Sequence, residues 1–207
     1  CKRACQRKTS CWHFTRLISE NTRGLPRIKV VNKKDILWKL GYLGAAGAVF
    51  MIDQTTKAWA QSRLRFEDVR EIIPGFLNFA YATNTGVAFS MFDDHGDAGR
   101  WGLSIVALVA AILVLYFFWR TPRSDDRVLG GLALLLAGIV GNVTDRARLG
   151  YVVDFIDVQF GSWHYPTFNV ADIAICTGAG LLILDMFLTK KTEDAKQKTE
   201  EKPAENT

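Results

Sequence analysis

The chain has 207 residues and a formal net charge of +5, and hydrophobic residues make up 49% of it. This length suits one domain or a small helical bundle. The average composition hides a contrast, because residues 1–39 carry eleven Lys or Arg and residues 189–207 are almost wholly polar, whereas the segment between them is strongly apolar.

The first spanning helix is expected to run from about Asp35 to about Ala60. Its uncharged part, 40–52, has thirteen residues and reaches spanning length only if the helix continues past Asp53 and Lys57. These two side chains are four residues apart on one helix face, in the order that favours an ion pair. Two interpretations remain open. The two side chains could form an ion pair near the interface that only neutralises its own charges, or they could orient something at the outer surface.

Residues 61–99 form an outer segment. A turn at 72–75 is followed by alternation at 76–82, which predicts a strand, and 87–92 resume an apolar stretch. The four Phe and one Tyr of 76–92 fit a sheet or helix lying on the outer leaflet. We therefore expect a small β-like cradle or lid between the first and second helices.

Three further apolar runs predict the other spanning helices. Residues 101–119 are all uncharged and would span about 28 Å at ~1.5 Å per residue. Residues 128–144 are at the short limit, and 173–184 extend to Leu188 if Asp185 snorkels to the surface. The sequence thus predicts an all-α membrane protein, with a bundle of four transmembrane helices and the cradle on its outer face.

The basic residues predict the orientation of this bundle. With both termini and the loop 120–127 on one side, that side holds nineteen Lys or Arg and the other side six. Because Lys and Arg concentrate on the cytoplasmic side, we expect cytoplasmic termini and an outward-facing site. The expected parts are a basic, disordered N-terminal extension (1–35), a four-helix domain (36–188) and a polar cytoplasmic tail (189–207).

The four cysteines do not indicate a metal site. Cys1, Cys5 and Cys11 lie in the cytoplasmic extension, where thiols stay reduced, and their spacing matches no C-x2-C pattern. Cys176 lies in the last apolar run and is interpreted as a packing residue. We therefore expect no bound metal.

Polar residues in or beside the spanning runs map to one depth, the outer end of the bundle. Asp172 is near the start of the last helix, where the helix dipole favours its anionic form. Asp154 follows two valines, and burial there would raise its pKa. Carboxylates with opposite tendencies are typical of an acid–base pair. His164, a histidine near this end, is interpreted as a packing or headgroup contact.

From these residues alone, two functions remain open: hydrolysis at an aspartyl dyad, and a polar-lined membrane transporter or binding protein. Asp172 could be a helix N-terminal acid, Asp154 a loop acid, and Asp145 with Arg146 a structural ion pair. Transporters tend to place their sites at mid-bilayer and often contain repeats. No repeat is visible and the polar residues lie at one face, which counts against transport.

Four segments, in order, resemble the bacterial prolipoprotein signal peptidase family (signal peptidase II). They are VFMIDQTTKAWA at 49–60, NTGVAFS at 84–90, GNVTDRARLGYVVDFIDV at 141–158 and FNVADIAI at 168–175. Each is weak alone, but the ordered set is specific and covers residues from about 40 to 188. The resemblance implies an inner-membrane aspartic endopeptidase that cuts diacylglyceryl-modified prolipoproteins before the lipidated cysteine and releases the signal peptide.

The resemblance also implies residue roles. Asp154 and Asp172 would be the catalytic pair, one a general base on water and the other protonated to polarise the scissile carbonyl. Asp145 competes for a catalytic role but ranks lower, because Arg146 would keep it ionised and structurally occupied. We expect no cofactor, no nucleic acid partner, contact with membrane lipids, and a monomer. The residues that would shape or hold the site are Asp53, Lys57, Asn84, Asn142, Asp145, Arg146 and Asn169.

Overall fold

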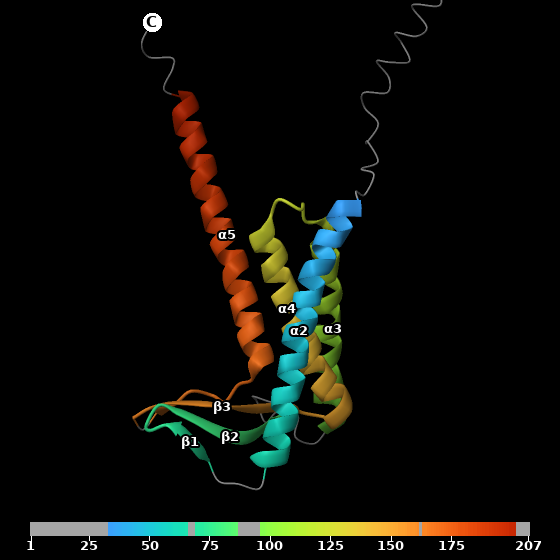
Figure 1. Ribbon diagram of the computed structural model, residues 1–207, viewed down its shortest axis with the longest axis vertical. Helices are drawn as coiled ribbons and strands as arrows, with labels where there is room; N and C mark the ends of the chain where they lie inside the picture. The colour runs from blue at the N-terminus through green and yellow to red at the C-terminus, as the bar shows by residue number, and fades with distance from the viewer. Residues whose placement is uncertain (1–32, 66–68, 87–95, 162, 202–207) are drawn as a thin grey trace, which may run out of the picture. The chain divides into compact units, whose positions relative to one another are not determined.

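A computed structural model describes residues 33–65, 69–86, 96–161 and 163–201. Cys1, Cys5, Cys11, nearly all of the N-terminal extension and the apolar stretch at 87–92 lie outside these residues. Four described helices are long and apolar enough to cross a membrane, which confirms the predicted number (Figure 1). They are α2 (Lys33–Arg63), α3 (Gly96–Arg120), α4 (Asp126–Leu149) and α5 (Val170–Glu201).

The outer surfaces of these helices are apolar. Val106 and Ile112 on α3 expose 67% and 59% of their surface, and Met51 on α2 exposes 60%. A soluble protein rarely leaves so much contiguous apolar surface open, whereas a lipid-facing helix must. The polar segment expected to begin at 189 is helical up to Glu201, because α5 continues that far. The Asp185 carboxylate, which was expected to snorkel to the surface, forms an ion pair with Arg127 at 2.9 Å.

Glycines bring α4 and α5 close together, and α4 also packs on α3. A Cβ at Gly178 would lie 2.6 Å from the Gly131 carbonyl oxygen, and one at Gly138 would overlap the Ala171 carbonyl. Small residues of this kind let helix backbones approach within a membrane. The close approach sets the first turn of α5 directly against the C-terminal half of α4.

A four-stranded antiparallel sheet, in the order β1-β2-β3-β4, lies where α4 ends and α5 begins (Figure 1). Its strands are β1 (Arg70–Ile73), β2 (Leu77–Asn84), β3 (Val152–Phe160) and β4 (Trp163–His164). The expected strand at 76–82 corresponds to β2. The all-α description was wrong in one respect, because the segment treated as a loop after α4 supplies β3 and β4. The first four residues of β3 are all buried, so they show none of the alternation that marks a half-exposed strand.

The end of α2 anchors the sheet through a small apolar core. Ala60 and Leu64 are buried with Val153 and Phe155 of β3. The Trp59 ring makes edge contacts with both Phe79 and Phe155, at centroid distances of 5.6 and 6.4 Å. This core fixes β3 relative to the helix that carries Asp53 and Lys57.

Candidate active site

The first turn of α5 is held by three side chains. Asn169 accepts the backbone N–H of Asp172 at 3.0 Å, and Asp172 accepts the backbone N–H of Asn169 at 3.2 Å. This reciprocal pair is a capping box. Asp53 of α2 accepts the N–H of Ala171 at 2.8 Å, which satisfies another free donor of the helix start. The position of Asp172 is therefore tied to both the cap and α2.

Asn169 also connects this helix start to β3. Its side chain is fully buried, and Nδ2 donates to Asp154 Oδ1 at 2.7 Å. Because its Oδ1 is already engaged by the Asp172 N–H, only the amide nitrogen remains to face Asp154. One asparagine thus contacts both predicted catalytic acids.

Lys57 forms the centre of a second cluster. Its ammonium lies 3.0 Å from Asp53 Oδ2 and 2.9 Å from Asp145 Oδ2, and it donates to Asn142 Oδ1 at 2.9 Å. An ammonium group has three donors, and here each has a partner. Asp53 and Lys57 therefore form a buried network and not a pair at the surface, since Lys57 is only 2% exposed.

Asn142 joins the two clusters. Its Nδ2 donates to Asp172 Oδ1 at 2.8 Å, while its Oδ1 accepts from Lys57 and, at 3.3 Å, from Asn169. A continuous set of hydrogen bonds therefore runs from Lys57 to Asp172 and on to Asp154.

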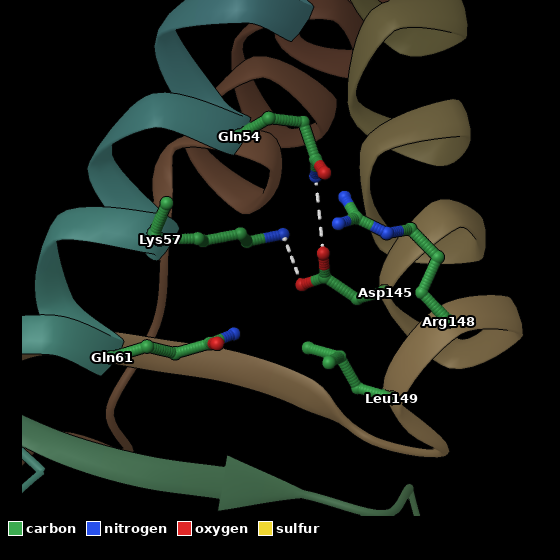
Figure 2. A pocket seen from close by; sticks show the side chains of 7 residues that line it. Gln54, Lys57, Gln61, Asp145, Arg148 and Leu149 are labelled. Carbon is green, nitrogen blue, oxygen red and sulfur yellow. Dashed lines mark hydrogen bonds and ion pairs between the residues drawn. The ribbon is translucent and has the colours of Figure 1, made fainter.

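Asp145 is fully occupied by neighbouring groups, as Figure 2 shows in part. Besides Lys57, it accepts from Gln54 Nε2 at 3.0 Å and from the backbone N–H of Val153 at 3.3 Å. Its ion-pair partner is thus Lys57, whereas Arg146 interacts electrostatically most strongly with Asp172, then with Asp154 and Asp145. Asp145 links α2, α4 and the start of β3.

The environment of Asp154 favours its protonated form. Burial is the main cause, and the nearby charge of Asp172 adds to it; together they raise the pKa of Asp154 to about 6. Hydrogen bonds from Asn84 and Asn169 and the charge of Lys57 act in the opposite direction. A carboxyl group of this kind can hold a proton close to neutral pH.

Asp154 also lines an open pocket of about 350 Å³, between the end of β2 and residues 166–167. Asn84 lines it too, and its Oδ1 accepts the Gly86 N–H at 2.8 Å, so its amide nitrogen is left for Asp154. Gly86 has φ +79°, and a Cβ there would overlap Leu103 of α3. Asp154 can therefore be reached from this pocket.

The structure brings the predicted site residues together, and it adds two that were missed. Gln54 directly follows Asp53 in the first motif, and Gly86 ends the Asn-Thr-Gly turn, so both carried a signal in the sequence.

His164, expected to be a packing or headgroup contact, pairs with Asp157 at 3.0 Å. Burial alone would raise the pKa of Asp157, but hydrogen bonds from Asn78 and His164 outweigh it and lower that pKa. Within the described ranges, no group of three or more His, Cys, Asp or Glu side chains is arranged to hold a metal ion.

The chain is similar to known proteins in both sequence and fold. A lipoprotein signal peptidase of Teredinibacter turnerae is 41% identical over 80% of this chain and 100% of its own, and one of Pseudomonas putida is 40% identical over 75% and 92%. A bacterial membrane enzyme solved by the in meso method at 1.9 Å resolution is 30% identical, with a TM-score of 0.62 over 75% of this chain and 94% of its own. The profile of the family described as Signal peptidase (SPase) II matches residues 45–188. The chain therefore belongs to the signal peptidase II family.

Proposed function

We propose that this peptidase is an aspartic endopeptidase that removes signal peptides from diacylglyceryl-modified prolipoproteins by cutting before the lipidated cysteine. Family membership supports the substrate class. The observation that carries the catalytic type is the contact of Asn169 with both Asp154 and Asp172 beside an open pocket. The transporter alternative is not favoured, because the relatives are peptidases.

The surroundings of the two acids support different roles. Asp172 accepts from the Asn142 amide and the Asn169 backbone, and it lies at the positive end of α5. These donors stabilise a carboxylate and suit a general base. Asp154, with its raised pKa, suits the protonated partner that donates to the scissile carbonyl. Arg146 lies close enough to interact with both acids and reduces their repulsion.

The proposed reaction needs only these groups and one water. Asp172 takes a proton from the water while its oxygen attacks the scissile carbonyl carbon, and Asp154 transfers its proton to the carbonyl oxygen. In the resulting diol intermediate, the C–N bond breaks as Asp172 returns its proton to the nitrogen of the lipidated cysteine. Asp154 takes back a proton from the diol as the new carboxyl group forms. Both acids return to their starting states.

The proposed orientation places this site outside the cytoplasm, in the inner membrane. In Figure 1 the sheet and the start of α5 lie at the opposite end of the helices from the start of α2. The charge asymmetry supports cytoplasmic termini, and the sheet would form a cradle at the outer face. We also propose that 36–188 is the peptidase domain, flanked by a basic extension (1–35) and a cytoplasmic tail (189–207), and that it works as a monomer.

The test of this function uses the purified full chain and a diacylglyceryl-modified precursor. Mass spectrometry should detect a product that begins at the lipidated cysteine. A matched precursor with that cysteine replaced by serine cannot be lipidated and should remain uncut. Equal cleavage of both precursors, or cutting at another bond, would refute the proposed substrate class.

A further inference from the structure

We propose that Lys57 is a positioning residue that makes Asp172 the base of the dyad by fixing the orientation of Asn142. The inference rests on the proposed aspartyl mechanism and assigns a cause to the difference between its two acids. Lys57 does not contact Asp172 through any bond described above. Lys57 would act on Asp172 through the side-chain amide of Asn142.

The charge of Lys57 determines which way the Asn142 amide faces. Lys57 is a donor only, so Asn142 must turn its Oδ1 towards the ammonium. Nδ2 then faces Asp172 at 2.8 Å. The opposite orientation would set an amide N–H₂ against an ammonium and an amide oxygen against a carboxylate. Both contacts would be repulsive, so the charge of Lys57 selects the orientation that serves Asp172.

Lys57 and Asn142 are both buried, which strengthens their interaction. Lys57 is 2% exposed and Asn142 is 8% exposed, so little water screens their interaction. Hydrogen bonds in series polarise one another in such an environment. The amide that accepts from a charged lysine therefore becomes a stronger donor to Asp172. Asp53 and Asp145 hold the ammonium in place from its other two sides.

The amide donors of Asp154 are oriented differently from the amide donor of Asp172. For Asp154, the donor Asn84 is oriented by the uncharged Gly86 N–H, and Asn169 by the Asp172 N–H. The amide donor of Asp172, in contrast, has its oxygen held directly by the Lys57 ammonium. The other charged groups around Asp172 are Asp154 on β3, Arg146 on α4 and Asp53 on α2. Of these, Arg146 acts on both acids and does not by itself distinguish them.

The experiment measures kcat/KM against pH for cleavage of the lipidated precursor. Asn142→Ala removes the donor while leaving Lys57 with its two acidic partners. The acidic limb, set by ionisation of the base, should move to higher pH by about one unit, and kcat should fall about tenfold. The alkaline limb, set by Asp154, should move less.

A second variant tests the part played by Lys57. Lys57→Met is combined with Asp145→Asn so that the net charge of the buried cluster stays at −1, with Asp53 as the carboxylate that remains, and Asp145→Asn alone is the matched control. The double variant should shift the acidic limb in the same direction, and the control should not. Adding Asn142→Ala to the double variant should give no further shift, because both changes interrupt one path.

Three results would overturn the inference. An unmoved acidic limb in Asn142→Ala would show that the amide does not set the base. A shift in the Asp145→Asn control equal to that of the double variant would leave Lys57 without a role. Additive shifts would mean that Lys57 acts by another route. If the double variant does not fold, Asn142→Ala alone decides. Cleavage that survives in Asp172→Asn would instead refute the proposed dyad itself.

Discussion

Asn169 donates a 2.7 Å hydrogen bond to Asp154, and this bond joins the start of α5 to β3. Because the same side chain caps α5, it contributes both to stability and to the geometry of the two acids. The two contributions can be separated by the choice of replacement.

We predict that Asn169→Ala lowers kcat by at least about a hundredfold and the free energy of unfolding by about 2 kcal/mol. Asn169→Ser keeps a good N-cap but is too short to reach Asp154. It should recover part of the lost stability and little of the activity. Thermal unfolding and single-turnover cleavage measure the two effects. Full activity in either variant would show that the bridge is dispensable.

Asp145→Asn should affect folding more than chemistry. The carboxylate holds Lys57, Gln54 and the Val153 N–H, and an amide cannot accept all of these bonds. We expect a lower yield and a loss of about 1 to 3 kcal/mol in stability, with turnover per folded molecule changed less than tenfold. A well-folded but inert Asp145→Asn protein would make Asp145 a catalytic candidate ahead of Asp154.

Asp154→Asn should stabilise the protein at neutral pH while removing activity. The pKa of Asp154 is raised to about 6 in the folded state, above its unfolded value, so the folded state binds this proton more tightly. Stability from this group is present below about pH 4 and is lost as pH rises to about 6. At pH 8 the variant should therefore gain about 3 kcal/mol, and at pH 4 close to nothing. A melting temperature at or below that of the native protein at pH 8 contradicts this.

Gly86→Ala tests whether the turn after β2 positions Asn84. A Cβ at Gly86 would overlap Leu103, and the φ of +79° is strained for alanine. Gly75→Ala is the matched control, because Gly75 has a similar φ of +69° but nothing within 4 Å of a built Cβ. Both should lose about 1 kcal/mol of stability, but only Gly86→Ala should lose activity. Equal activity losses in the two would argue against a positioning role.

The sequence predicted the spanning helices, and the gathering of the polar residues at one end of them, better than it predicted the sheet. Spanning length and apolar composition are local properties, so residues such as 101–119 could be assigned directly. The strand β3 could not, because Val152 and Val153 are buried on both faces and produce no alternation. The ion-pair partner of Asp145 could not be predicted from the sequence either. Arg146 is its neighbour in sequence, whereas its true ion-pair partner, Lys57, lies 88 positions away and meets it only after α2 and α4 pack.

The most direct test compares single-turnover cleavage by Asp154→Asn and Asp172→Asn with that of the native protein, each shown to be folded by its thermal unfolding curve. The proposed dyad predicts that both variants lose at least about a thousandfold in rate, with precursor binding retained. Near-native cleavage by either folded variant would contradict the proposal that these two acids carry the reaction.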